Sequence, residues 1–219
     1  MGLWPRAFRV RHQGIHQHPD RLGRAGSRRP GEGCATSTRR VTLETQRLLL
    51  EPVSTSHADG LHAAVVASRP ELLPWMPWAR EPSPESSLAM TRRDEQAWRS
   101  DRVFHFAVIE RESGDALGVA GLNRQGADGA ELHYWIRTDH AGRGLTTEAC
   151  RALIDWARDE LGVSYLTLWA GRENHASRRV AQKVGFTHLG PLSWRPEGGL
   201  GDFDAESYEL RFTSVPRRP

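Results

Sequence analysis

The 219-residue sequence predicts one α/β domain built on a mixed, twisted sheet and preceded by a basic segment. Three observations lead to this prediction. Three strand-like runs between residues 103 and 138 are joined by short turns, which is typical of an antiparallel meander. After residue 144, helical and strand-like runs alternate, as in a βαβ unit. Residues 1–40 have neither a helical nor a strand period, and they are rich in arginine, glycine and proline.

The body begins near residue 41 with one expected strand and two expected helices. The apolar run in residues 47–53 predicts a strand that ends near Pro52. Residues 55–68 carry apolar side chains at helical spacing, so we expect a helix there. An irregular, proline-rich connection follows, and a second helix ends near residue 101.

The next part of the chain predicts the meander. Residues 103–111 are apolar on both faces, as expected for a central strand. Turn residues at 112–115 and 126–129 separate this run from two further strands at 116–123 and 130–138. Because the connections are short, we expect the three strands to pair antiparallel.

The last part predicts the βαβ half. A long amphipathic helix is expected over residues 144–161, followed by a strand at 164–170 and a short helix at 174–184. Residues 186–189 and 203–212 are expected to form the closing strands. The sum is a mixed sheet of seven strands with about four helices, and this pattern alone is compatible with several functions.

Charge is distributed unevenly along the chain. The 30 basic and 27 acidic residues give a net charge of +3, yet residues 1–40 alone carry nine arginines and two acids. We expect this segment to be a disordered tail and residues 41–219 to be the folded domain. An arm that contacts RNA or the ribosome and an organelle transit peptide are the alternatives for the tail.

Several protein classes are not expected. No apolar run approaches the length of a membrane helix, and the N-terminus lacks the apolar region of a secretory signal. The two cysteines, Cys34 and Cys150, form neither a disulfide framework nor a zinc spacing. We therefore expect a cytoplasmic protein that binds no metal and no membrane.

The strongest local signal is the junction between the strand at 130–138 and the following helix. Gly142 and Gly144 allow main-chain N–H groups to approach an anion closely. The new helix N-terminus adds a partial positive charge, and Thr146 and Thr147 add hydroxyl donors. The turn therefore suits a pyrophosphate, although a turn used only for packing would have the same pattern. It lacks the third glycine of GxGxxG and the GK[ST] of a Walker loop.

Five segments carry more specific patterns. They are TQRLLLEP at 45–52, LPWMPW at 73–78, AELHYWI at 130–136, HAGRGLTTEA at 140–149 and NHASRRVAQKVGF at 174–186. Together they resemble the GNAT acetyltransferases, in the ribosomal-protein N-terminal acetyltransferase branch of RimJ/RimL type. The resemblance covers residues 45–212 and implies the GNAT fold, whose sheet has a splayed central strand pair.

The resemblance implies acetyl-CoA as co-substrate and an activity that moves its acetyl group directly to a primary amine. The residues implied to bind acetyl-CoA are Trp135, Ile136, Arg137, His140, Ala141, Gly142, Arg143, Gly144, Leu145, Thr146, Thr147, Asn174 and Ser177. A main-chain N–H near Trp135 or Ile136 is implied to stabilise the oxyanion. Ser177 is implied to give a hydrogen bond or proton to the departing sulfur, and Asn174 also suits a helix N-cap.

The general base stays open among three residues. Glu131 could accept the proton of the amine if burial raises its pKa. His133 lies on the same strand face by the period of two, and histidine is the natural base near neutrality. Glu197 lies in the C-terminal loop near the place of an acceptor-side carboxylate in this branch.

Four residues are expected at the acceptor: Trp75, Trp78, Tyr134 and Glu197. The favoured acceptor is a protein N-terminal α-amine, with a small-molecule amine as the alternative. A non-catalytic module that binds acyl-CoA or RNA is a further alternative, and the chain could be a monomer or a homodimer. Two positions depart from the family pattern: Asp139 replaces a glutamine or arginine of the loop, and His133 stands where the branch often has glycine or serine.

Overall fold

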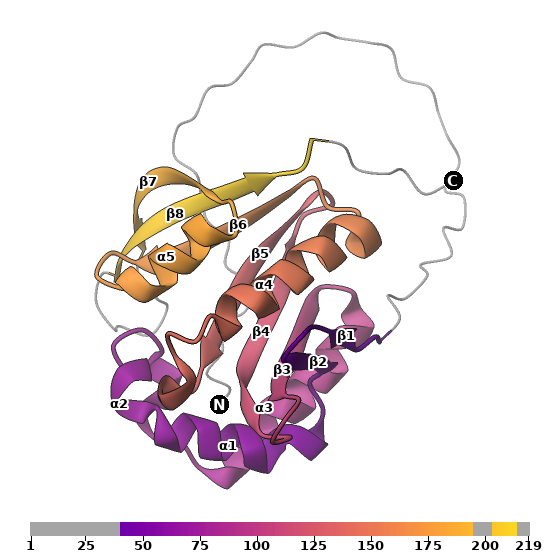
Figure 1. Ribbon diagram of the computed structural model, residues 1–219, viewed down its shortest axis with the longest axis vertical. Coiled ribbons are helices and arrows are strands. Elements are labelled where there is room, and N and C mark those ends of the chain that lie inside the picture. Colours follow the sequence, from indigo (N-terminus) through magenta and orange to yellow (C-terminus); the bar gives the residue numbers. More distant parts are fainter. Residues whose placement is uncertain (1–39, 195–202, 214–219) are drawn as a thin grey trace, which may run out of the picture.

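A computed structural model describes residues 40–194 and 203–213 of the chain (Figure 1). The strands are β1 (Leu43–Glu44), β2 (Leu48–Pro52), β3 (Val103–Glu110), β4 (Ala116–Gln125), β5 (Gly129–Ile136), β6 (Tyr165–Gly171), β7 (Thr187–Trp194) and β8 (Phe203–Arg211). The α-helices are α1 (Ala58–Ala67), α2 (Arg69–Leu72), α3 (Pro84–Ala97), α4 (Leu145–Trp156) and α5 (His175–Lys183). Shorter 3₁₀ turns occur at Thr55–His57, Pro77–Arg80, Trp98–Ser100 and Thr138–His140, and a π-helical turn, Ala157–Leu161, extends α4.

All strands belong to one sheet in the order β1-β2-β3-β4-β5-β6-β8-β7. Strands β2 to β5 pair antiparallel, which is the expected meander with the opening strand at its edge. β6, β8 and β7 also pair antiparallel, and β5 and β6 form the one parallel pair of the described sheet.

The parallel pair is short. It joins only Gly129, Ala130 and Glu131 of β5 to Tyr165, Leu166 and Thr167 of β6. Beyond Glu131 the two strands diverge, as Figure 1 shows. This is the splayed central pair that the family resemblance implied, and it opens the edge of β5 over its last five residues.

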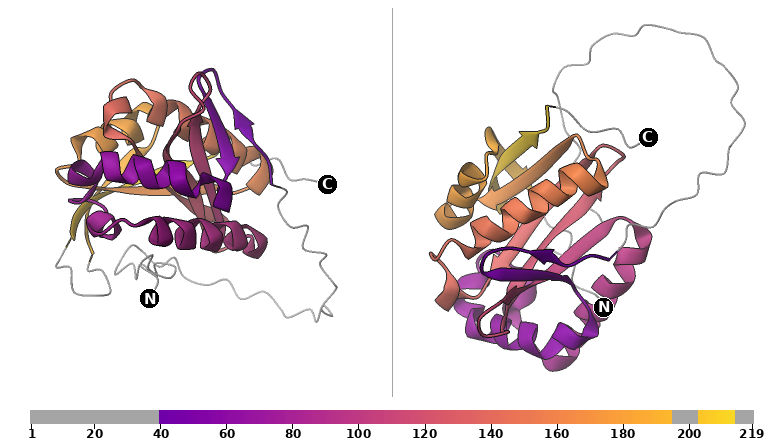
Figure 2. Two further views of the ribbon diagram at one scale, coloured as in Figure 1. Left: turned by 90° about the horizontal axis from the view of Figure 1, so that it is seen from below. Right: turned by 45° about the vertical axis from the view of Figure 1, so that its right-hand side comes forward.

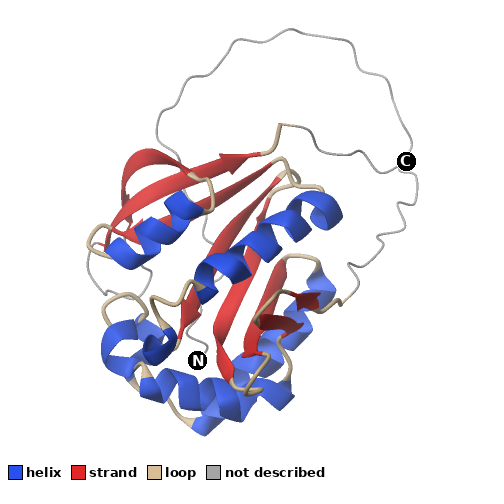
Figure 3. Ribbon diagram, in the orientation of Figure 1, coloured by secondary structure: helices blue, strands red, loops and turns tan. Residues whose placement is uncertain are grey.

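Helices cover both faces of the sheet (Figure 3). We call the face under α4 and α5 the front face and the opposite face, under α1 and α3, the back face. On the front face, α4 packs on a core that includes Phe104, Phe106, Leu122 and Leu132. On the back face, α1 packs on a smaller core that includes Trp135. Figure 2 shows α1 and α3 lying alongside one another on this side.

Alternation along β5 divides its side chains between the two faces. Ala130, Leu132, Tyr134 and Ile136 pack with the front core, whereas Trp135 packs with the back core. Glu131 and His133 share the back face with Trp135 because successive side chains of a strand point to opposite faces. The sheet therefore places the candidate residues of β5 in two separate environments.

The structure also adds elements to the expected plan. The two-residue strand β1 pairs with β2 and brings the number of strands to eight. The proline-rich connection contains α2 and a 3₁₀ turn instead of being wholly irregular, and β7 continues to Trp194. The expected tail at residues 1–40 lies almost entirely outside the described residues. No helix in the described part of the chain is long and apolar enough to cross a membrane.

Candidate active site

The loop before α4 has the conformation that its glycines predicted. Gly142 and Gly144 have φ angles of 76° and 82°, in the left-handed region that favours glycine. A Cβ on Gly142 would meet no atom within 4 Å, so the space beside this residue is open. The first turn of α4 starts at Leu145 and directs its N–H groups to the same place. The backbone therefore fits an anion such as a pyrophosphate.

A network of hydrogen bonds anchors this loop to the start of the sheet. The Glu148 carboxylate accepts from the Thr45 hydroxyl (2.6 Å) and from the Arg47 main-chain N–H (2.8 Å). The Arg47 guanidinium lies 2.7 Å from the same carboxylate and donates to the Arg143 carbonyl (2.9 Å). Thr45, Arg47 and Glu148 lie in segments that carry the family resemblance, but sequence reasoning assigned these three residues no role. In the structure they fix the loop.

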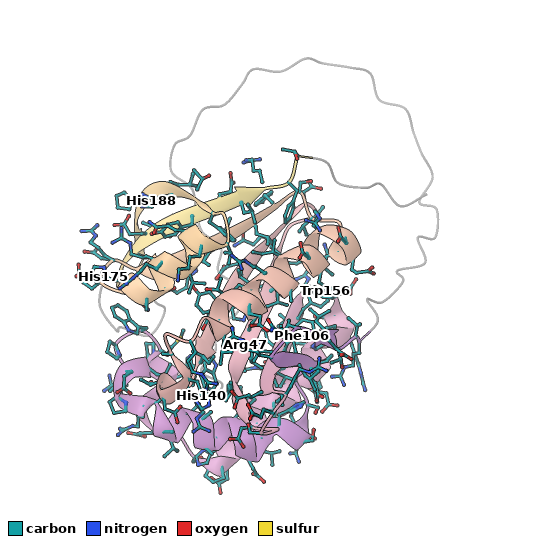
Figure 4. The ribbon with its side chains drawn as sticks, viewed as in Figure 1. Arg47, Phe106, His140, Trp156, His175 and His188 are labelled. Atoms are coloured by element: carbon teal, nitrogen blue, oxygen red, sulfur yellow. The ribbon has the colours of Figure 1, made fainter. Side chains whose placement is uncertain are left out.

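The charged side chains of the loop have partners within the protein. Arg143 pairs with Glu110 (3.0 Å), and Arg137 pairs with Asp139 (2.6 Å). His140 lies 3.6 Å from Glu110, and Figure 4 shows it near the start of α4, as it shows Arg47. Hydrogen bonds from Arg137 and His140 hold the pKa of Asp139 below its usual range. Main-chain groups, more than these cations, are thus presented to an anion.

The main chain of β5 directs alternate peptide groups to its two neighbours. The Asp128 carbonyl, just before β5, accepts from Ser164 beside β6 (2.6 Å), and the Arg137 N–H, just after β5, donates to Leu117 of β4 (2.7 Å). Since peptide groups alternate in direction along a strand, the N–H and C=O groups of the even-numbered residues of β5 point toward β6. Beyond the last paired residue these are Leu132, Tyr134 and Ile136. Their N–H and C=O groups face the edge at which β5 and β6 diverge.

Ser177 lies on the front side of this edge, in the first turn of α5. Asn174 is the N-cap of that helix, and its side chain accepts from the Ser177 N–H (3.0 Å). The Ser177 hydroxyl is 2.9 Å from the Tyr134 hydroxyl of β5, which also donates to the Ser177 carbonyl. Burial raises the pKa of Tyr134, so its phenol stays protonated. The two hydroxyls connect the diverging strand to α5.

Glu131 lies on the back face at the last paired position of β5. It is 6% exposed. Its carboxylate accepts from the Trp169 indole N–H (2.8 Å) and from the Gln125 amide (3.1 Å), and the Thr167 hydroxyl donates to the oxygen of that amide (3.0 Å). Burial raises the pKa of Glu131, and the two donated hydrogen bonds oppose the increase.

The next two residues of this face also have neighbours from other elements. The His133 ring meets the His105 ring of β3 edge-on, with centroids 4.6 Å apart. Burial lowers the pKa of His133 well below its usual value, and His105 adds to the decrease. The Trp135 ring packs against Trp78 at 5.8 Å. Glu131, His133 and Trp135 thus form a row on β5.

The structure separates some residues that the sequence grouped together. Tyr134 was expected at the acceptor, but it points to the front face and bonds Ser177, since it is one residue out of step with Glu131 and His133. Trp78 packs on the back face, and Trp75 is half-buried in the same connection. Glu197 lies outside the described residues. Among the described residues, no cluster of three metal-ligating side chains is present.

The chain is similar to proteins whose family is known. It matches the acetyltransferase (GNAT) domain over residues 47–187. The "Putative ribosomal N-acetyltransferase YdaF" of Bacillus subtilis (strain 168) is 30% identical over 147 residues, which are 65% of this chain and 77% of that protein. The "Uncharacterized N-acetyltransferase YoaA" of the same strain is 24% identical over 152 residues, covering 68% and 85%.

Solved structures share the fold. Mycobacterium smegmatis RimJ in complex with CoA-disulfide has a TM-score of 0.72 at 21% identity, with 81% of this chain and 90% of that chain covered. RimL, the ribosomal L7/L12 alpha-N-protein acetyltransferase in complex with coenzyme A, has a TM-score of 0.69 at 19% identity, covering 78% and 98%. The predicted GNAT fold is confirmed. The chain belongs to the GNAT acetyltransferase family, and it is an N-acetyltransferase.

Proposed function

We propose that the enzyme transfers the acetyl group of acetyl-CoA directly to the α-amine of a protein N-terminus. One observation carries this proposal. Where β5 leaves β6, a buried carboxylate lies on one face of β5 and a pair of hydroxyls lies on the other. A proton acceptor and a hydrogen-bond donor thus flank one strand edge, as amide formation from a thioester requires.

The residues at the front side of that edge fit acetyl-CoA. The main-chain N–H groups of Gly142, Gly144 and the first turn of α4 would hold its pyrophosphate, because this segment is open and carries the helix dipole. The peptide groups of Tyr134 and Ile136 would pair with the pantetheine arm as an added strand. The alternation along β5 favours Ile136 over Trp135 as the main-chain donor to the acetyl oxygen.

Glu131 is the proposed base. The acceptor arrives as an ammonium group, and its nitrogen must lose a proton to attack the thioester carbon. Burial raises the pKa of Glu131, which makes its carboxylate a stronger base than that of an exposed glutamate. His133 is the weaker candidate, because burial and the neighbouring His105 lower its pKa and disfavour protonation of the ring.

Ser177 is the proposed donor to the leaving group. As the new C–N bond forms and the C–S bond breaks, the sulfur gains negative charge and takes a proton. The Ser177 hydroxyl, oriented by Tyr134 and by its place in the first turn of α5, can give a hydrogen bond to that sulfur. Of the two protons that the nitrogen loses, one neutralises the CoA thiolate and the other is released to solvent, which returns Glu131 to its charged form.

The relatives support a protein acceptor. YdaF is named a "Putative ribosomal N-acetyltransferase", and RimL is described as an alpha-N-protein acetyltransferase. We therefore infer that the enzyme acts on proteins in the cytoplasm. Two further points stay predictions: that residues 1–40 could contact RNA, and that the chain is either a monomer or a homodimer.

Release of free thiol from acetyl-CoA tests this function. The acceptors are peptides with different first residues and a set of small amines, and Gly142→Glu is the control. We expect turnover of at least one peptide and none in the control. Turnover of small amines alone would replace the protein acceptor with a small molecule. Binding of acetyl-CoA without turnover on any amine would overturn the catalytic assignment.

A further inference from the structure

Three titratable side chains on the back face, two of them buried and one half-buried, have no part in the proposed reaction. Asp94 of α3 is 3% exposed, and its Oδ2 lies 2.8 Å from Nδ1 of His105 on β3. The third side chain is His133 of β5, whose ring meets that of His105. We call Asp94, His105 and His133 the back-face array. The ring nitrogens of both histidines are shielded from solvent. The array therefore runs from α3 across the sheet to the row that contains Glu131.

Gly121 of β4 provides the space for this array. It lies opposite His105 on one side and opposite His133 on the other. A Cβ on Gly121 would come within 2.7 Å of the His105 ring and within 3.0 Å of the His133 ring. The two rings thus fill the volume that a side chain at this position would occupy. Neither ring can tilt far toward β4.

The chemistry of the array is unusual for a packing layer. A buried carboxylate–imidazole pair is rarely better for stability than apolar side chains of the same volume. The same face also carries an apolar and aromatic cluster that includes Val119 and Trp135. Buried titratable groups gathered beside a catalytic carboxylate are more typical of a functional site than of a core.

His133 lies beside Glu131 on the face of β5 from which the acceptor is proposed to approach. It shares a face with Glu131 and is two residues farther along β5, a separation of about 7 Å. The next residue of the row, Trp135, is covered by Trp78. An acceptor whose amine reaches Glu131 along this face would place the carbon next to that amine close to the His133 ring.

We propose that His133, held in place by His105 and Asp94, limits the size of the group that the acceptor carries on the carbon next to its amine. His133 is then a specificity-determining residue, and His105 and Asp94 are positioning residues. The preferred acceptors are α-amines of small first residues such as glycine, alanine and serine. This inference rests on the proposed function, because it assumes acetylation of an α-amine near Glu131.

The test compares two peptides that differ only in their first residue, serine or phenylalanine. We measure kcat/KM for both peptides, and calorimetry gives their affinities for the enzyme–CoA complex. In His133→Ala we expect the ratio of kcat/KM values to move toward the phenylalanine peptide by about 10-fold or more. The affinity of that peptide should increase as well. His133→Phe keeps the bulk of the ring and should keep the preference for serine.

The positioning residues are tested by the same ratio. His105→Ala removes the support of the ring, so it should shift the ratio in the same direction as His133→Ala but by less. A smaller folded fraction lowers the rates for both peptides equally and leaves their ratio unchanged. His62→Ala removes a histidine of α1 that contacts Ser87, and it should leave the ratio unchanged.

The outcomes separate this inference from the function on which it rests. If His133→Ala acetylates peptides with an unchanged ratio and unchanged affinities, the inference is wrong and the proposed function stands. If the wild-type enzyme acetylates no peptide, both fail. Should His133→Ala not fold, His133→Asn carries the same prediction with a smaller shift.

Discussion

The two faces of β5 present different chemistry to a substrate that lies along the strand edge. On the front face, Tyr134 joins Ser177 of α5 through a pair of hydroxyls, beside a loop built from main-chain N–H groups. On the back face, Glu131 lies in a row with His133 and Trp135, each packed against a residue of another element. The front face suits an anionic donor molecule, and the back face suits a cationic acceptor.

The difference shows how one strand can serve two substrates. Side chains alternate along β5, so neighbouring residues reach opposite faces while the peptide groups between them stay at the edge. In the proposed reaction, the reacting atoms can meet at this edge because the pairing with β6 ends at Glu131. A parallel ladder that continued to Ile136 would close the edge and separate the two groups.

The largest effect is expected from removing the base on the back face. Glu131→Gln keeps the shape of the side chain but cannot accept a proton. We expect kcat to fall by roughly 10²- to 10⁴-fold, with the affinity for acetyl-CoA unchanged. Steady-state kinetics and calorimetry measure the two quantities. A nearly normal kcat in this variant would show that another residue is the base. The proposed division of roles between the two faces of β5 would then be wrong.

A disrupted front face should lose affinity instead. Gly142→Glu forces an ordinary side chain into a left-handed conformation and places a negative charge at the anion site. We expect the affinity for acetyl-CoA to fall by roughly 100-fold, because strain and repulsion each contribute about 1–2 kcal/mol. Calorimetry with acetyl-CoA measures this loss.

A matched control separates strain from binding. Gly114 in the turn between β3 and β4 also has a left-handed φ, 78°, and open space around its Cβ position. Gly114→Glu should lower the melting temperature as Gly142→Glu does but leave the affinity for acetyl-CoA intact. Equal loss of affinity in both variants would show that the loop has no particular role.

A smaller effect is expected from the hydroxyl pair. Tyr134→Phe removes the hydrogen bond that orients Ser177, which is worth about 1 kcal/mol, so kcat should fall by roughly fivefold. Because Tyr134 faces the front, the preference among acceptor peptides should not change. Competition between two peptides in one reaction measures that preference, and a changed preference would place Tyr134 at the acceptor after all.

The smallest effect is a shift of the pH profile. The Trp169 indole donates to the Glu131 carboxylate, which stabilises the charged form and lowers its pKa. Trp169→Phe should therefore raise the pKa of Glu131 further. Since the base acts when deprotonated, kcat/KM should begin to fall at a higher pH than in the wild type. A profile displaced to lower pH would contradict this assignment.

The sequence alone predicted the backbone on the front side of the site. The loop around Gly142 and the N-cap at Asn174 depend on backbone conformation and on short-range hydrogen bonds, which neighbouring residue types reveal. The division into strands and helices was predictable for the same reason. The edge strand β1 was not, because two residues carry no period.

The back side could be predicted only in part. The period of two places Glu131 and His133 on one face of β5, and the same period places Tyr134 on the opposite face. The partners Trp169, His105 and Asp94 come from distant parts of the chain. Their contacts depend on strand register and on the gap at Gly121, which no local pattern of residues contains.

The central claim is that the coenzyme and the acceptor bind on opposite faces of β5. Its most direct test is a crystal structure with coenzyme A and an acceptor peptide bound together. We predict that the peptide nitrogen lies on the back face within roughly 2.6–3.2 Å of the Glu131 carboxylate, or one water away. The coenzyme sulfur should lie on the other side of the β5 edge, next to Ser177. A peptide nitrogen bound beside Tyr134 on the front face, out of reach of Glu131, would contradict the account.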